Sequence, residues 1–184
     1  MKHDVMVYNT KLPPELCNLF VQQASTFSLD NAPIGRPNEV HEKVRKSDIK
    51  WIGQENWICG FLWNYIKLAN ETNFGYDLLG FDNQHVQYTE YGPGGHYSWH
   101  VDRMNNEPDV VRKLSLTLQL SRFGEEYTGG ELQFFDDTVN NTFTAPTDYG
   151  VITIFDSRIR HRVKKVKTGT RKSLVAWAVG PRWK

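Results

Sequence analysis

Cysteine is scarce in this chain, and its two cysteines form no pattern that would bind a metal. Cys17 and Cys59 are far apart and have no metal-type spacing, so a cysteine-based zinc site is excluded. Both fall in segments that we predict to be helical. We interpret them as buried thiols in a reducing compartment, and a disulfide between them stays open as the alternative.

An excess of charge of either sign is also missing, as is any long apolar run. Lys and Arg number 22 against 21 Asp and Glu, a net charge of +1, so no overall field favours nucleic acid or an acidic membrane. No apolar run is long enough to span a bilayer, and residues 1–4 open no signal peptide. We therefore expect a soluble, cytoplasmic protein with neither a membrane nor nucleic acid as its partner.

The sequence contains no internal repeats and no low-complexity segments, and its 184 residues indicate one domain. Helical periodicity predicts one helix that begins near Pro13 and a second, amphipathic helix over residues 55–71. Many short strands follow from about residue 81. This order is typical of an α+β fold. We predict a double-stranded β-helix (jelly-roll) core over residues 81–184, with the helices and strands of residues 1–80 packed on one sheet as support.

The clearest predicted strand runs over residues 114–120, where leucines alternate with polar residues. The leucines face the core, and Ser115, Thr117 and Gln119 share the other face. We expect that polar face to line a cleft, although a solvated outer face is the default for an isolated sheet. Residues 31–46 and 103–108 are predicted loops. The first is either a plain surface connection or a lid over substrate.

The stretch Tyr97-Ser98-Trp99-His100-Val101-Asp102 carries the first candidate site. It follows the glycine-rich residues 92–95, and Val101 between two polar residues predicts the start of a strand. Alternation along a strand places His100 and Asp102 on one face, from which an imidazole and a carboxylate could hold a metal ion. Taken alone, such a pair is more often a surface hydrogen bond.

Two later residues extend this pair into a possible metal site with an anion clamp. His161 follows a strand-like run at residues 151–155, and Arg171 begins a strand on which Ser173, Val175 and Trp177 share its face. Two histidines and one carboxylate occupy three positions on one face of an octahedral ion, the arrangement typical of non-haem Fe(II) oxygenases. An arginine with a neighbouring hydroxyl offers a planar fork and an extra donor for a carboxylate.

In their order and spacing, these motifs resemble the 2-oxoglutarate/Fe(II)-dependent dioxygenases, and among them the prolyl-4-hydroxylase-like branch. The matching residues cover roughly the last hundred positions, a length that suits one domain core. They are Tyr91, the glycine-rich turn at 92–95, His100-Val101-Asp102, Gly129-Gly130-Glu131-Leu132, His161-Arg162-Val163, Gly169-Thr170-Arg171 and Trp177.

The resemblance implies roles for individual residues. His100, Asp102 and His161 would ligate Fe(II), and Arg171, helped by Ser173, would bind the distal carboxylate of 2-oxoglutarate. Tyr91 matches the family tyrosine that hydrogen-bonds this cosubstrate, although a plain core aromatic fits the residue equally well. Thr117 and Gln119 are weaker candidates for the same pocket. Ascorbate is the expected reductant.

The resemblance also implies a reaction: hydroxylation of a peptidyl proline or a similar protein side chain, with release of succinate and CO2. The same chemistry on a free amino acid, another small molecule or a nucleobase is the alternative, and the balanced charge disfavours the nucleobase. A non-catalytic jelly-roll binding module is a third interpretation. A zinc helix with His96 and His100 is disfavoured by the preceding glycines and the lack of a following Glu, so we interpret His96 as a loop residue.

Overall fold

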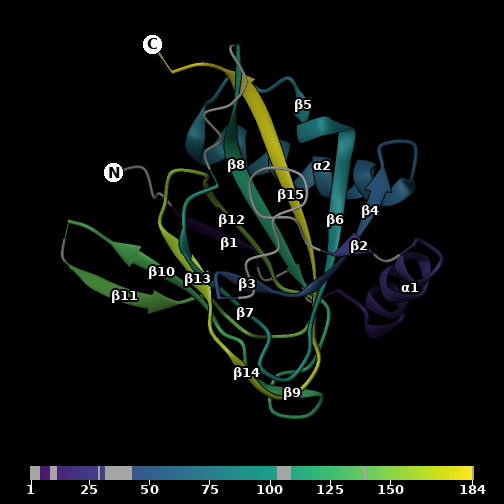
Figure 1. Ribbon diagram of the computed structural model, residues 1–184. Helices are drawn as coiled ribbons and strands as arrows, with labels where there is room; N and C mark the ends of the chain where they lie inside the picture. The colour runs from purple at the N-terminus through teal and green to yellow at the C-terminus, as the bar shows by residue number, and fades with distance from the viewer. Residues whose placement is uncertain are drawn as a thin grey trace.

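The computed structural model describes residues 5–8, 12–28, 30–31, 43–102, 109–138 and 140–183. Its elements form two antiparallel sheets, a small β-ribbon and two α-helices (Figure 1). None of the helices in the described residues is long and apolar enough to cross a membrane. The predicted loop at 103–108 and most of the predicted loop at 31–46 lie outside the described residues.

The larger sheet has eight strands. Its order is β1-β12-β8-β15-β6-β4-β2, and β5 pairs with β15 off this path. The strand bounds are β1 Val5–Tyr8, β2 Asp30–Asn31, β4 Asp48–Gly53, β5 Gly80–Phe81, β6 His85–Tyr91, β8 Val110–Gln119, β12 Ile152–Asp156 and β15 Arg171–Pro181.

Both α-helices pack on one face of this larger sheet, as predicted. Helix α1 (Pro14–Ser25) starts with a proline at its first position, and α2 (Trp57–Ala69) is capped by Asn56, whose side chain accepts a hydrogen bond from the Ile58 amide (3.1 Å). A π-helical turn, Asn70–Phe74, follows α2. The apolar side chains of the two helices and of β8, β12 and β15 form one buried cluster. Cys17 and Cys59 belong to it as free, buried thiols.

The smaller sheet has five strands in the order β11-β10-β13-β7-β3. The strand bounds are β3 Arg45–Lys46, β7 His96–His100, β10 Leu132–Asp136, β11 Asn141–Thr144 and β13 His161–Val163. A two-stranded ribbon of β9 (Tyr127–Gly129) and β14 (Val166–Gly169) completes the β-structure. A second, smaller buried cluster lies here, formed by apolar residues that include Tyr91, Leu132, Phe134 and Phe155.

Three local predictions differ from the structure. The His-x-Asp motif lies at the end of a strand and not at its start, because β7 ends at His100 and Val101 and Asp102 follow it. His96, which we interpreted as a loop residue, begins β7 because its backbone pairs with Lys46. The predicted loop at 31–46 has strand residues at both ends, Asn31 in β2 and Arg45–Lys46 in β3, because they pair with β4 and β7. A 3-10 turn over Asp82–Gln84 precedes β6.

Candidate metal centre and anion pocket

The two histidines of the candidate site lie on neighbouring strands of the smaller sheet. His100 ends β7, His161 begins β13, and the two are paired across the strands. Each ring uses Nδ1 to contact a backbone carbonyl two residues earlier, Ser98 for His100 (2.7 Å) and Ile159 for His161 (2.9 Å). Because a carbonyl only accepts, each Nδ1 must carry the proton, which leaves each Nε2 with a free lone pair.

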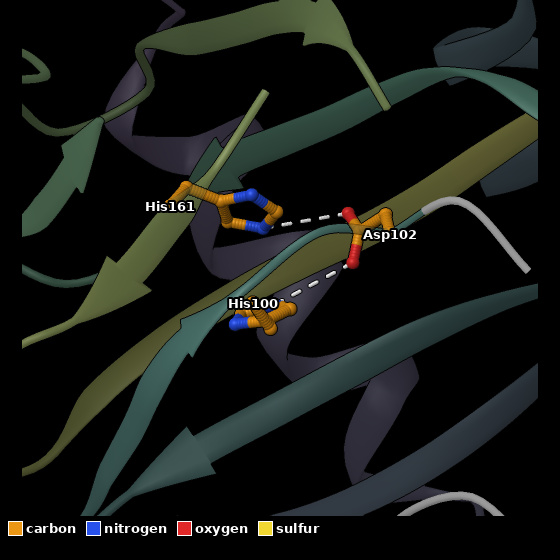
Figure 2. Close-up of side chains that lie close together, drawn as sticks. All are labelled: His100, Asp102 and His161. Carbon is orange, nitrogen blue, oxygen red and sulfur yellow. Dashed lines mark ion pairs between the residues drawn. The ribbon is translucent and has the colours of Figure 1, made fainter. Parts of the chain in front are cut away.

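Asp102 closes the group from the segment that follows β7 (Figure 2). Its Oδ1 lies 3.5 Å from Nε2 of His100 and its Oδ2 lies 3.4 Å from Nε2 of His161. The backbone amide of Asp102 donates to the Ser157 carbonyl (3.0 Å), and the Ser115 hydroxyl donates to Oδ2 (2.7 Å). Backbone and side chain are thus both fixed, so the carboxylate is preorganised toward the two rings.

The pKa shifts of His161 and Asp102 suit a metal ion. Burial lowers the pKa of the His161 imidazole despite the nearby Asp102. For Asp102, burial by itself raises the pKa, but the two imidazoles and Arg112 outweigh it and the pKa is lowered. Metal binding requires neutral imidazoles and an ionised carboxylate.

The geometry of the donor set fits a 2-His-1-carboxylate metal site. One ligand atom from each of His100, Asp102 and His161 lies within 4.8 Å of the others, so that one ion can contact all three. Asp102 and His161 are 7% and 5% exposed, which means that little water competes for them. Two nitrogens and one oxygen on one side of an ion leave its other positions open, as an Fe(II) oxygenase requires.

Arg171 lies in the same pocket as this triad, but it comes from the larger sheet. It begins β15, is 4% exposed, and donates through Nη1 to the Ser173 hydroxyl (3.3 Å). Among the residues that the structure describes, no carboxylate forms an ion pair with it. A buried guanidinium without an acidic partner is costly unless a ligand supplies the negative charge.

The predicted face of β15 does line the pocket. Tyr91, Thr117, Ser173, Val175 and Trp177 all border it together with the metal triad and Arg171. Gln119 borders an adjoining recess that Thr117 and Arg171 also line. The polar face of β8 therefore faces a cleft, as predicted.

Comparison with known proteins adds the family. The family model described as the 2OG-Fe(II) oxygenase superfamily matches residues 86–179, which include all three triad residues and Arg171. The chain belongs to this superfamily. The expectation drawn from the sequence motifs is confirmed, and the prolyl-4-hydroxylase-like branch is the part of the superfamily that the chain resembles.

Curated relatives of this oxygenase are named PKHD-type hydroxylases. One from Crocosphaera subtropica is 34% identical over 94 residues, which cover 50% of this chain and 41% of the relative. Another from Prochlorococcus marinus is 37% identical over 93 residues, with 50% and 40% covered. The match thus spans about two fifths of the length of these relatives.

Solved structures resemble the oxygenase over nearly its whole length. A Pseudomonas putida prolyl-4-hydroxylase has a TM-score of 0.76 at 22% identity and covers 99% of this chain and 94% of its own. A Trichoplax adhaerens prolyl hydroxylase, solved with a peptide fragment of hypoxia inducible factor, has a TM-score of 0.77 at 19% identity, with 95% and 83% covered. At these identities the likeness establishes the fold.

Four residues of the oxygenase site were not singled out from the sequence. Ser115 was placed on the correct strand face but given no role. Tyr97 stacks on the His100 ring (centroids 3.5 Å apart, planes 16° apart). Tyr127 accepts a hydrogen bond from Gln119 (2.7 Å) beside Arg171. Arg45 lines the pocket from a predicted loop. The tyrosines had no signal in the sequence beyond their aromatic character.

The glycine pair of the Gly-Gly-x-Leu motif has a local role next to Arg171. Gly130 has φ +68°, and a Cβ there would lie 2.8 Å from Val166 Cγ2 and 3.2 Å from Arg171 Cδ. A larger residue would therefore be strained and would also push on the arginine. The motif keeps the backbone close to the base of the anion pocket.

Proposed function

We propose that this protein is a 2-oxoglutarate- and O2-dependent Fe(II) hydroxylase in which His100, Asp102 and His161 hold the iron. The lowered pKa of the His161 imidazole, the buried Asp102 carboxylate and the 4.8 Å spread of the three ligand atoms support this assignment. We further propose that residues 1–184 form one domain, with a double-stranded β-helix (jelly-roll) core at 81–184 and helical and strand support at 1–80.

The observation that carries this proposal is a buried Arg171 that has no acidic partner among the described residues and shares a pocket with the metal triad. Its fork, together with the Ser173 hydroxyl, would take the distal carboxylate of 2-oxoglutarate. Thr117 and Tyr91 would supply further contacts from the pocket wall. A non-catalytic binding module would have no use for such an anion clamp beside a metal triad.

When bound, Fe(II) and 2-oxoglutarate supply the oxidising chemistry, in which 2-oxoglutarate, O2 and a substrate C–H bond give succinate, CO2 and an alcohol. The chain's own residues prepare that reaction. Arg171 orients the keto acid so that its other end faces the triad, and Ser115 holds the Asp102 carboxylate in place. The aromatic rings of Tyr97 and Phe155, packed on the two histidines, keep water from the ligands.

A peptidyl proline, or a similar protein side chain, is the substrate that we propose. Support comes from the prolyl hydroxylases of the same fold, one of which was solved with a peptide. A proline-containing peptide has a restricted backbone and loses little entropy on binding in a groove. A free amino acid or another small molecule is the alternative outcome of the test below.

The test measures succinate formed from 2-oxoglutarate by the protein with Fe(II), O2 and ascorbate as the reductant. We expect a slow background that proline-containing peptides stimulate, with a gain of one oxygen on proline in the recovered peptide by mass spectrometry. Stimulation by free amino acids alone would replace the protein substrate with a small molecule. Absence of any succinate at saturating iron would overturn the proposal.

A further inference from the structure

The arginines of the described residues differ in how their charge is paired. Arg112, Arg122, Arg158 and Arg160 each form an ion pair with a carboxylate. Arg45 and Arg171 are the most deeply buried of the described arginines, at 8% and 4% exposed, and both line the pocket of the metal triad. Within the described residues neither has a carboxylate partner. Arg171 is accounted for by the cosubstrate, whereas Arg45 is not.

The position of Arg45 is fixed by three contacts. It lies in β3, where its backbone pairs with Tyr97. Its Nε donates to the Ser47 hydroxyl (2.9 Å), and its guanidinium carbon lies 4.9 Å from the centre of the Tyr97 ring. The same Tyr97 ring stacks on His100. One aromatic ring therefore contacts both Arg45 and a proposed iron ligand.

The terminal nitrogens of Arg45 have no partner in the described part of the chain. Its only side-chain hydrogen bond there uses Nε, so the two-pronged end of the guanidinium keeps its donors for a ligand in the pocket. A planar fork of this kind matches a carboxylate, which can accept two parallel hydrogen bonds. Burial strengthens such a contact because water competes less for it.

Charge balance in the pocket leads to the same conclusion. Apart from the two histidines, which bind a metal ion as neutral imidazoles, the charged side chains that line it are Arg45, Asp102 and Arg171. Taken together, the positive charges of Fe(II) and Arg171 are balanced by the negative charges of Asp102 and the two carboxylates of 2-oxoglutarate. The charge of Arg45 remains, and a buried unpaired charge is costly. A further ligand with one negative charge would neutralise it.

Arg45 and Arg171 belong to different sheets, which separates their tasks. Arg171 lies in the larger sheet beside Ser173, while β3 is the edge strand of the smaller sheet next to β7. Arg45 therefore reaches the pocket on the side of His100 and Tyr97. A cosubstrate held by Arg171 leaves that side to the molecule that is to be oxidised.

We propose that Arg45 is a specificity-determining residue that binds a carboxylate of the substrate. The substrate class is then a molecule with an anionic group close to the carbon that is hydroxylated. Two sources share this chemistry: an acidic side chain next to a proline in a peptide, and the free carboxylate of a small amino acid. The inference rests on the proposed function, since it assigns the substrate of that same site.

Calorimetric binding of matched ligand pairs tests this inference without turnover. The protein is loaded with Zn(II) and 2-oxoglutarate, and each pair differs only in the carboxylate: a blocked proline–glutamate peptide against its proline–glutamine counterpart, and L-proline against L-prolinamide. In one pair we expect the carboxylate to bind about ten- to a hundredfold more tightly, the range of a charge-assisted hydrogen bond. The pair that discriminates identifies the source.

Variants connect the preference to Arg45. In Arg45→Gln the two ligands of the discriminating pair should bind with nearly equal dissociation constants. Arg45→Lys keeps the charge but loses the fork, so the ratio of the two dissociation constants should be intermediate. Arg162→Gln is the matched control, because Arg162 also lies in the smaller sheet but bonds to Gln133 and contacts Trp99 outside the pocket. It should keep the wild-type ratio. Melting curves verify that each variant is folded.

Three outcomes would overturn the inference: neither pair discriminates in the wild type, the preference survives in Arg45→Gln, or Arg45→Gln loses affinity for 2-oxoglutarate instead. Succinate formation by the wild type shows whether such a result contradicts only the role of Arg45 or also the proposed hydroxylase function. Succinate without discrimination contradicts only the role of Arg45. No succinate contradicts the hydroxylase, while the zinc-loaded titration still decides whether Arg45 binds a carboxylate.

Discussion

Replacement of Ser115 by alanine should weaken metal binding although Ser115 touches no metal position. Its hydroxyl donates to Oδ2 of Asp102 (2.7 Å) and lies 3.0 Å from the Ser157 hydroxyl. Ser115 is fully buried, so water cannot easily take its place. In Ser115→Ala the carboxylate keeps its backbone anchor to Ser157 but loses the side-chain donor that holds one oxygen in position.

The size of the effect follows from the charge on the acceptor. A hydrogen bond to an ionised group contributes about 1.5–3 kcal/mol, which corresponds to about one to two powers of ten in affinity. Loss of an outer partner of a metal ligand typically costs about ten- to a hundredfold in metal affinity. We therefore expect the dissociation constant for Fe(II) to rise by about tenfold or more.

The assay is an anaerobic titration of Fe(II) against a competing chelator. Ser121→Ala is the matched control, because Ser121 is also fully buried, follows the same strand β8, and accepts a hydrogen bond from the Lys172 amide (2.9 Å). Both variants should lose stability, but only Ser115→Ala should lose metal affinity. Equal affinities in Ser115→Ala and the wild type would refute the idea that Ser115 positions Asp102.

The other predictions concern the ligands, the clamp and a distant ion pair. Alanine at His100, Asp102 or His161 should abolish succinate formation in a folded protein, and near-wild-type turnover of one variant at saturating iron would remove that residue from the ligand set. Arg171→Lys should raise the Michaelis constant for 2-oxoglutarate by about ten- to a hundredfold, because the bidentate fork is lost; an unchanged constant would place the clamp elsewhere. At Asp156 burial alone would raise the pKa, but hydrogen bonds from the Arg158 and Tyr76 side chains outweigh burial, and the pKa is lowered. The ionised carboxylate therefore stabilises the folded protein above the ordinary Asp pKa of about 3.9, and this contribution is lost as the pH falls below that value. Denaturant unfolding of the wild type and Asp156→Asn should therefore differ at pH 7 and converge in acid, and a constant difference would contradict this assignment.

Much of this fold and site was predictable because the relevant signals are local. The alternating leucines of β8 and the helical spacing of α2 each depend on neighbours in sequence, and both elements form where predicted. The triad was predictable for a different reason: the His-x-Asp pair and the later histidine resemble, in order and spacing, the motifs of a known family. The structure brings all three together.

Strand direction and partner choice could not be predicted in the same way. Whether His100 starts or ends a strand depends on β13 and β3, which pair with β7 from distant parts of the sequence. Arg45 lay in a segment without periodicity, and only its pairing with Tyr97 carries it into the pocket. The role of Ser115 likewise depends on where Asp102, which follows a strand of the other sheet, comes to lie.

The division of the site between two sheets gives Ser115 a significance beyond one hydrogen bond. The smaller sheet and the segment after it supply the triad, whereas the larger sheet supplies Arg171 and the wall of the anion pocket. Ser115, on β8 of the larger sheet, bonds to Asp102 and so connects the two halves directly at the metal position. An ion bound by the triad would fix Asp102, and through Ser115 it would fix β8, which pairs with β15 beside Arg171. Because a ligand that binds only the folded arrangement stabilises it, metal and cosubstrate should each favour the same juxtaposition of the two sheets. Together with the backbone bond from Asp102 to Ser157, the buried Ser115 is therefore a residue through which we expect the metal half and the anion half of the site to keep their relative position.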